Sequence, residues 1–562
     1  MAQQRPAANL IAACSVLMAL ASTWVQPLRL LLAEGHGYYT FALVGDEPYY
    51  AERIQRLIPG TTGTNPHNGV ADPNAISNLF LDGLLRAMVT ALGLEVLTAF
   101  WIWRFVFPVV LYALLFWLAR VTARRRPAAE HAVYAALAYG IIHAAYEICV
   151  AYPKLQGWIM RIPSGAEYLL SVAVLIFFWR FLALRHTAAA FGLATAMAAL
   201  ATLRPYSAVA WGPACALGAM LAMATGRLKL KTALAAGALG FVLLTPMIGV
   251  EAWNRGIAAH QEMMQRYFGA TPYAIHPRWP WLLGIGALIG SAAYFVKGRR
   301  RLAVVALGAS VALLAVLAGV PPGVRVELLA FDRFGCLYLP ALAFAVLLAI
   351  RKPVSSGRLP VTALGVAACA LSGAVLARNA AYDFSTLKET PYNAILKEQQ
   401  YLAGYQFVAQ HTPEDAWVLL DDTIDWTMVP PGDRKFEHVW YQKHWRDDMF
   451  SIVARRKRYS HLRLYMCPMS NVELYALTHF QRLTFGLRFE DEAKADRMYG
   501  QLLNAFKPGY IFWKREAPVP RGRGARLKDA CEVLYTDRAC EVWKIRYPEA
   551  LSVFEDSANA AR

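Results

Sequence analysis

The chain has 562 residues, of which 57% are hydrophobic and only 17% are charged, and it carries a net charge of +18. Soluble globular proteins carry about 25% charged residues, so this composition excludes a protein that is soluble throughout. The positive charge does not indicate nucleic-acid binding, because much of it stands in short clusters between apolar segments, with no basic stripe of interleaved aromatic residues. We predict a polytopic α-helical membrane domain over residues 1–377 and a small soluble α/β domain over residues 378–562.

A helix needs ~20 residues to cross a bilayer, and the apolar segments of about this length predict about eleven spans. They lie at roughly 8–30, 97–119, 132–151, 166–184, 187–203, 207–225, 232–250, 280–297, 303–320, 333–350 and 359–377. Residues 1–22 also permit a second interpretation, a cleaved signal peptide with Ala-Leu-Ala at 19–21 as its cleavage site. Under both interpretations the segment 31–96 lies outside the cytoplasm.

Clusters of lysine and arginine set the predicted orientation. With the N-terminus inside, the inner connections begin near residues 120, 185, 226, 298 and 351, and these are the basic segments, such as RVTARRR at 120–126. Cytoplasmic loops accumulate Lys and Arg, so all five connections agree with one topology. The C-terminal domain is then extracytoplasmic, which in a bacterial cell means an inner-membrane protein with a periplasmic domain.

The long first outer loop carries an acidic pair. Asp46 and Glu47 stand in the run YYTFALVGDEPYYAERIQRL, shortly after the first predicted helix. Carboxylates there can lie at the membrane surface and face a cavity between helices, and Tyr49, Tyr50 and Arg53 are predicted to line it. The alternative is that both acids only cap the helix that follows, since carboxylates are favourable at a helix N-terminus.

Later in the same loop, residues 74–92 predict an amphipathic helix on the membrane surface. Its apolar face is Ile76, Leu79, Phe80, Leu84, Met88 and Leu92, and its polar face is Asn78, Asp82 and Arg86. Asp82 and Arg86 also form a favourable pair one turn apart. Such a helix can wall off a cavity at the outer interface, or it can simply pack under the C-terminal domain.

Arginines recur near the predicted outer ends of the spans, where a cation is costly and tends to be functional. They are Arg104, Arg161, Arg204, Arg325 and Arg333, with His143, Glu147 and Tyr206 at a similar depth. Guanidinium groups there can bind a lipid phosphate bidentately and with a permanent charge. The alternatives are that each arginine extends to ordinary phospholipid headgroups, and that Arg333 pairs with Asp332.

Four features together resemble the GT-C superfamily of membrane glycosyltransferases. They are the acid just after the first helix, the surface helix in the same loop, the outer arginines and the extracytoplasmic C-terminal domain. The runs GDEPYYAERI, LRPYSA and DRFGCLYLPAL are similar to those of bacterial relatives of protein O-mannosyltransferases and of lipid A aminoarabinose transferases. The resemblance covers the whole chain in layout and these short runs in detail.

The resemblance implies an inverting transfer of one sugar from a polyprenyl-phosphate donor to a hydroxyl of a glycan, lipid or protein acceptor outside the cytoplasm. It implies Asp46 as the catalytic base, with Glu47 as the alternative. The binding groups for the donor phosphate would be Arg161, Arg204, Arg325 and Arg333, and the cavity would be lined by Tyr49, Tyr50, Arg53, Glu147 and Tyr206. No motif in the sequence requires a metal or another cofactor, and no DxD motif stands in the first loop.

The sequence of the C-terminal domain predicts alternating helices and strands. We expect helices at 391–411 and about 490–506, strands at 416–422 and 509–514, and a hairpin over the run ACEVLYTDRACEVWKIR. Cys531 and Cys540 stand on the two arms of this hairpin, and outside the cytoplasm a structural disulfide between them is plausible. Asp421, Asp422 and Asp425 match no metal-ligand spacing and are interpreted as solvated loop acids.

A multi-pass transporter or flippase of a lipid-linked or anionic substrate is the second class of function, since it too needs outer charges and a cavity. Transporters often show two related halves with broken helices in mid-membrane, and no such repeat is visible in the sequence. A scaffold without catalytic activity is the third class. A large outer domain and charges at the outer membrane edge fit chemistry on a lipid headgroup better.

Overall fold

The computed structural model describes residues 4–34, 79–94, 96–123, 126–149, 162–182, 186–203, 205–226, 228–255, 340–348, 361–386, 399–421, 457–460, 507–515 and 528–553, with residues 54, 184, 450, 453, 454 and 504. These residues fall into two compact units. Unit 1 contains the long helices before residue 386, and unit 2 contains helix α3 and the C-terminal sheet. The domain bounds 1–377 and 378–562 stay predictions.

The described part of unit 1 is built from long helices. They are α1 (Gln4–Glu34), α4 (Val96–Thr122), α5 (Ala128–Cys149), α7 (Ile162–Leu182), α8 (Ala188–Leu203), α9 (Pro205–Ala224), α10 (Leu230–Arg255) and α15 (Val361–Thr386), with a further helical segment at 340–348. Each coincides with all or part of a predicted span. The spans predicted at 280–297 and 303–320 lie outside the described residues.

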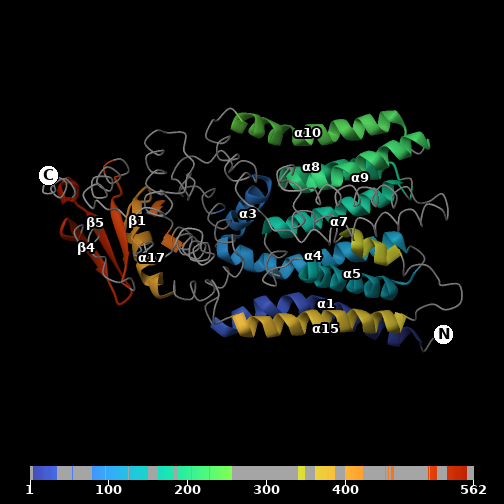
Figure 1. Cartoon of the computed structure of the whole chain (residues 1–562), viewed down its shortest axis with the longest axis horizontal. Helices are drawn as coiled ribbons and strands as arrows, with labels where there is room; N and C mark the ends of the chain where they lie inside the picture. Colours follow the sequence, from blue (N-terminus) through green and yellow to red (C-terminus); the bar gives the residue numbers. More distant parts are fainter. Residues whose placement is uncertain are drawn as a thin grey trace, which may run out of the picture. The chain divides into compact units, whose positions relative to one another are not determined.

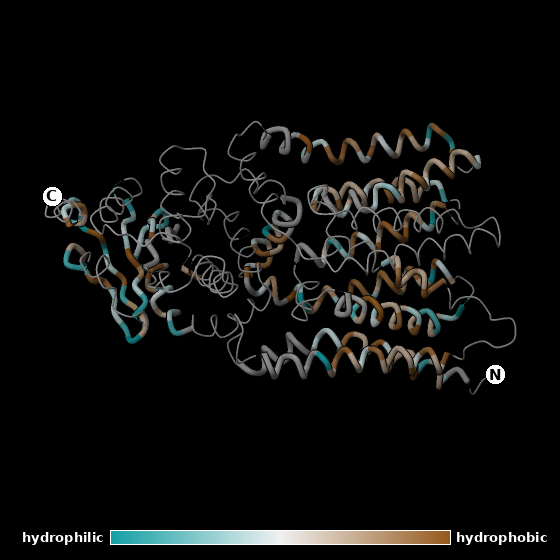
Figure 2. Tube along the Cα trace, viewed as in Figure 1, coloured by the Kyte–Doolittle hydropathy of each residue, from teal (hydrophilic) through white to brown (hydrophobic). Residues whose placement is uncertain are grey.

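Within the described residues, four helices are long and apolar enough to cross a membrane. They contain the segments Pro6–Trp24, Thr98–Thr122, Gly165–Leu182 and Val361–Arg378. Shorter apolar segments run over Ala188–Leu203, Trp211–Ala224 and Leu230–Pro246. Figure 2 shows hydrophobic residues along these helices. The protein is therefore mostly helical with several membrane-spanning candidates, and the full count of about eleven spans stays a prediction.

Contacts between the helices define two ends of unit 1. α4 and α5 are antiparallel neighbours, and the Tyr112 hydroxyl of α4 donates to the carbonyl oxygen of Ala132 in α5 at 2.9 Å. Near the last turn of α7, the Arg180 guanidinium lies 5.9 Å from the ring centre of Trp117, near the last turns of α4. The ends of α4 and α7 that lead into basic segments therefore lie together. We call this end, with residues 120–126, the basic end, and Figure 1 shows α1 beginning there.

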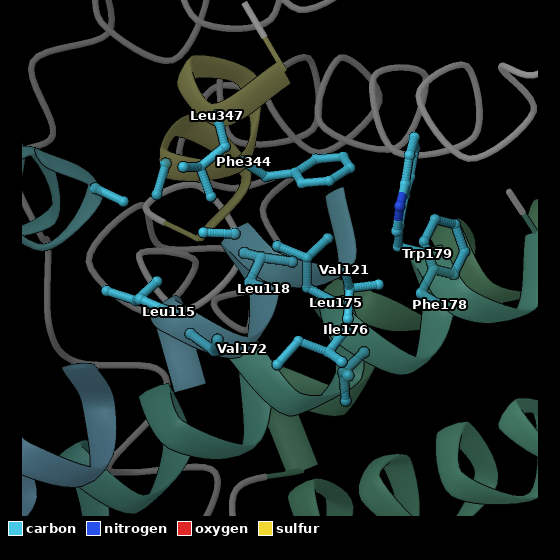
Figure 3. Close-up of a cluster of buried hydrophobic side chains, with 14 of the residues drawn as sticks. Leu115, Leu118, Val121, Val172, Leu175, Ile176, Phe178, Trp179, Phe344 and Leu347 are labelled. Atoms are coloured by element: carbon cyan, nitrogen blue, oxygen red, sulfur yellow. The ribbon is translucent and has the colours of Figure 1, made fainter. Parts of the chain in front are cut away.

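The core of unit 1 is made where α4, α7 and the segment 340–348 pack together (Figure 3). The ring of Trp179 meets the edge of Phe344 with 5.0 Å between ring centres. Leu115, Leu118 and Leu175 beside them are fully buried. This core fixes the packing of α4 against α7 near the basic end.

Small residues bring α15 close to α1, and Figure 1 shows the two helices side by side. A side chain at Gly365 would overlap the Ile11 side chain, so Ile11 of α1 packs directly on the backbone of α15 there. The Ser15 hydroxyl lies 3.4 Å from the carbonyl oxygen of Gly365. Small residues at helix contacts allow close approach in membranes, where helices associate by packing and hydrogen bonds.

Helix α3 (Leu79–Leu92) is the described part of the helix predicted at 74–92. Among the side chains of α3 that the structure describes, Leu85 and Val89 are buried, each 4% exposed, whereas Leu92 of the predicted apolar face is 62% exposed. Ile76, Leu79, Phe80 and Leu84 of the predicted apolar face lie outside the described side chains, so that face stays a prediction. The helix carries apolar residues on two neighbouring strips, so spacing alone did not separate them. The exposed strip with Leu92 remains available for a membrane surface.

Unit 2 contains a small mixed sheet. Its strands are β1 (Trp417–Asp421), β2 (Lys457–Ser460), β3 (Tyr510–Lys514), β4 (Cys531–Thr536) and β5 (Cys540–Ile545), in the order β2-β1-β3-β5-β4. The first three strands in this order are parallel, and β5 and β4 complete the sheet as an antiparallel hairpin. The predicted strands and hairpin are confirmed. A short 3-10 helix, η5 (Gln399–Tyr401), and α17 (Leu402–His411) match the end of the helix predicted at 391–411.

The core of unit 2 lies between α17 and the sheet. Tyr405 packs on Phe512 with ring centres 4.9 Å apart, and the edge of Phe450 meets the Tyr405 ring at 5.3 Å. All three side chains are fully buried. Gly404 of α17 faces Cys540 and Phe512 so closely that a side chain would collide with both. Mixed helix and strand layers of this kind fit the predicted α/β class.

The proposed disulfide between Cys531 and Cys540 is wrong. Both thiols are free in the structure. The hairpin register places Cys531 opposite Ile545, five residues from Cys540 along β5. At ~3.3 Å per residue the two cysteines are roughly 16 Å apart, whereas a disulfide needs Cα atoms within about 7 Å. Sequence placed both residues on the hairpin but could not supply this register.

Glu541 holds the hairpin to neighbouring segments. Its carboxylate accepts from Nη2 of Arg515 at 2.6 Å and from Nε1 of Trp543 at 2.7 Å, and it pairs with Nζ of Lys528 at 3.0 Å. Burial by itself raises the pKa of Glu541, but the hydrogen bonds from Lys528, Arg515 and Trp543 outweigh it and hold the pKa below its ordinary value. The ionised form is therefore the one that the fold stabilises.

This depressed pKa predicts acid sensitivity in unit 2. A carboxylate with a lowered folded-state pKa stabilises the fold fully above its unfolded pKa, about 4.3 for Glu, and loses this effect as the pH falls through the folded value. Glu541→Gln should lower the melting temperature of the detergent-purified protein at pH 7 and flatten its fall below about pH 4.3. Glu532→Gln, an exposed change on β4, is the control and should leave the profile unchanged. An unaltered acid profile in Glu541→Gln would contradict this role.

Candidate functional site

Most of the residues predicted to form the site lie outside the described residues. They are Asp46, Glu47, Tyr49, Tyr50, Arg53, Arg161, Arg204, Arg325 and Arg333. Glu147 and Tyr206 belong to α5 and α9, and their side chains lie outside the described set too. The structure does not bring these side chains together, so their grouping stays a prediction. It does describe the helices that carry or precede several of them.

A group of polar side chains lies where α1, α4 and α5 meet. The indole Nε1 of Trp24 donates to the carbonyl oxygen of Phe105 at 3.1 Å and links α1 with α4. The Tyr139 hydroxyl lies 2.8 Å from Oγ1 of Thr23 and links α5 with α1. Because the Thr23 hydroxyl donates to the carbonyl oxygen of Leu20 at 2.9 Å, Tyr139 is the donor in this pair.

Arg104 and His143 lie on the same side of this meeting point. Arg104 precedes Phe105 in α4 and is 4% exposed, and His143 follows Tyr139 by one turn in α5 and is 2% exposed. Since α4 runs toward the basic end and α5 runs away from it, Arg104 lies farther from the basic end than Phe105, and His143 lies farther from it than Tyr139. This is the end predicted to be outside the cytoplasm. We call the five side chains the polar junction: Thr23, Trp24, Arg104, Tyr139 and His143.

His143 is the member of the polar junction that the fold does not explain. Its ring centre lies 4.5 Å from that of Tyr139. Within the described part of the chain, neither Nδ1 nor Nε2 has a hydrogen-bond partner. Each unsatisfied buried polar group costs about 1–3 kcal/mol, and ionisable side chains inside membrane domains tend to mark substrate or proton pathways. A bound ligand would satisfy both nitrogens.

Glu167 is a second polar residue of this end, and the sequence analysis missed it. The Ser207 hydroxyl, in the first turn of α9, donates to the Glu167 carboxylate near the start of α7. Pro205 occupies the first position of α9, where its missing N–H is tolerated, and a carboxylate is stabilised beside a helix N-terminus. Arg204 is the residue between α8 and α9, so the bond between Glu167 and Ser207 holds the start of the helix that follows Arg204 in sequence. The available signal was an acid at the start of an apolar span.

Metal binding has no support from the described residues. Among them, no group of three or more His, Cys, Asp or Glu side chains is arranged to hold an ion. Asp421 ends strand β1, and Asp422 and Asp425 lie outside the described residues.

Comparison with known proteins gives a limited result. No family model matches the chain, and no curated protein matches it. Among solved structures, the chain is similar to the apo crystal structure of the Archaeoglobus fulgidus oligosaccharyltransferase, with 10% identity over 90% of this chain and 69% of that chain and a TM-score of 0.32. It is likewise similar to the complex of that protein with zinc and sulfate, with 10% identity over 95% and 73% and a TM-score of 0.32. A TM-score of this size does not establish a shared fold.

The contact between Glu167 and Ser207 predicts energetic coupling. Glu167→Ala and Ser207→Ala should each destabilise the protein by about 1–3 kcal/mol. The double variant should lose less than the sum, with a coupling of about 0.5–3 kcal/mol, because either change already removes the bond. Thermal unfolding of the four proteins in one detergent measures this.

The matched control is Ser171, a buried hydroxyl of α7 without a hydrogen-bond partner among the described residues. Ser171→Ala should be neutral or stabilising and should add to Glu167→Ala without coupling. Strict additivity of Glu167→Ala with Ser207→Ala would show that the two side chains do not interact.

Proposed function

We propose that the chain is an inverting glycosyltransferase that moves a sugar from a polyprenyl-phosphate donor to an acceptor hydroxyl on the outer face of the membrane. The observation that carries the proposal is the acidic pair Asp46–Glu47, which follows Glu34, the last residue of α1, by twelve residues. Residues 120–126, at the basic end, are predicted to be cytoplasmic. Because α1 begins at the basic end, its other end, which precedes the acidic pair in sequence, is the one predicted to face the outer side.

One carboxylate and a set of cations suffice for this chemistry. The acceptor hydroxyl attacks the anomeric carbon of the sugar, and Asp46 takes the hydroxyl proton as the new C–O bond forms. The bond between the anomeric carbon and the phosphate oxygen breaks on the opposite face, and its electron pair leaves on polyprenyl phosphate. Arg161, Arg204, Arg325 and Arg333 would stabilise that charge. Attack and departure on opposite faces invert the anomeric centre.

The positions of the polar side chains among the described residues support the proposal. Arg104, His143 and Glu167 are polar side chains at the end of unit 1 away from the basic end. Charged and ionisable groups inside a membrane domain are costly and tend to mark function. The end that precedes Asp46 is therefore the one equipped to handle a charged headgroup.

A transporter or flippase is the second candidate, and the buried Arg104 and His143 favour it, because such residues also line substrate pathways through membranes. A transporter would move a lipid-linked sugar without breaking its bond to phosphate. Chemical analysis of the donor after incubation separates the two functions.

Asp46→Asn should reduce transfer by roughly 10²–10⁴-fold, since the amide cannot accept the proton. The assay uses the purified full-length protein, a panel of undecaprenyl-phosphate sugars and membranes of a deletion strain as the source of unmodified acceptor. It measures labelled sugar in the acceptor and released undecaprenyl phosphate. Glu47→Gln is the matched control and should fall by less than about tenfold if Asp46 is the base.

Two outcomes would contradict the proposal at different levels. Undiminished transfer by Asp46→Asn would remove Asp46 as the base while leaving the enzyme class intact. No cleavage of any donor by the wild-type protein would remove the enzyme class itself.

A further inference from the structure

We propose that His143 binds the sugar phosphate of the lipid-linked donor, with one ring nitrogen donating to a phosphate oxygen and the other accepting from a sugar hydroxyl. The inference rests on the proposed function for the identity of the donor. The inference assigns a binding role to His143, for which the sequence predicted only a position near Glu147 at the outer end of a span.

The chemistry of the imidazole ring leads to this ligand. A neutral imidazole carries one N–H donor and one acceptor nitrogen. Within the described residues both nitrogens of His143 lack a partner, although the side chain is only 2% exposed. A sugar phosphate presents what the ring lacks, because its phosphate oxygens accept hydrogen bonds and its hydroxyl groups donate them.

The packing around His143 fixes the ring at the correct end of the helices. One side of the ring lies against Tyr139, whose own hydroxyl is engaged by Thr23. Tyr139 therefore supports the ring but does not satisfy it. Arg104 of α4 is buried at the same end, so a permanent cation stands near the level of the imidazole, as anionic ligands require.

A second buried histidine on α5 shows what a purely structural role looks like. His131 is 4% exposed, and its Nε2 lies 3.0 Å from the carbonyl oxygen of Ala123 at the basic end. Its ring also meets the edge of Phe116 with 6.1 Å between ring centres. The two histidines share a helix and a degree of burial and differ in whether protein atoms satisfy their nitrogens.

The two substitutions His143→Phe and His131→Phe make opposite predictions. His143→Phe keeps a ring on Tyr139 and removes two unsatisfied nitrogens, so the melting temperature should stay equal or rise. Its dissociation constant for undecaprenyl-phosphate mannose, glucose, galactose or arabinose, whichever binds the wild type, should rise at least tenfold. His131→Phe should lower the melting temperature and leave that dissociation constant within twofold of the wild type.

A second pair tests the hydrogen bonds without the ring. His143→Gln retains a donor and an acceptor, and His143→Met has a similar length without either. The dissociation constant of His143→Gln for the donor should lie within about threefold of the wild-type value. That of His143→Met should be at least tenfold higher than the wild-type value. His143→Phe and His143→Met should each weaken the binding of undecaprenyl phosphate without a sugar less than they weaken the binding of the full donor. Binding of inorganic phosphate tests the anion alone.

The outcomes separate this inference from the proposed function. Wild-type affinity in both His143→Phe and His143→Met would overturn the inference and leave His143 as a core residue. Binding of the donor by the wild type without transfer would overturn the proposed function while the affinities still decide the role of His143. Absence of donor binding to the wild type would overturn both.

Discussion

The hydrocarbon interior of a membrane accepts few polar groups, and this constraint organises unit 1. Helices satisfy their own backbone hydrogen bonds, so apolar helical segments are what can cross. Polar side chains must then gather at the helix ends or pair with one another. Alternating directions in α4 and α5, together with the contact of Arg180 on Trp117, give the unit two chemically different ends. One leads into basic loops, and the other contains Arg104, His143 and the Glu167–Ser207 pair.

This separation of ends links the fold to a reaction. A transferase that acts on a lipid phosphate needs cations at headgroup depth and a base that reaches an alcohol from outside the membrane. The sequence places Asp46 after the end of α1 that lies away from the basic end. The polar junction is at that same end of unit 1. In unit 2, Glu541 and the α17 contacts maintain a separately stabilised sheet.

Periodicity and charge predicted the helices of unit 1 and the strands of unit 2 well, because both depend on local composition. They failed where a partner far along the chain decides the outcome. Tyr139 bonds Thr23, 116 residues away in sequence, and no local pattern contains that pairing. The same holds for Glu167 with Ser207, and for the hairpin register that separates Cys531 from Cys540.

Electron cryomicroscopy of the full-length protein in lipid nanodiscs with a bound undecaprenyl-phosphate sugar tests the central claim most directly. The account predicts the sugar phosphate at the end of α1, α4 and α5 away from residues 120–126, with the anomeric carbon within reach of the Asp46 carboxylate and the phosphate among arginine side chains. Density for the sugar phosphate at the basic end, or with Asp46 and Glu47 remote from the anomeric carbon, would contradict it.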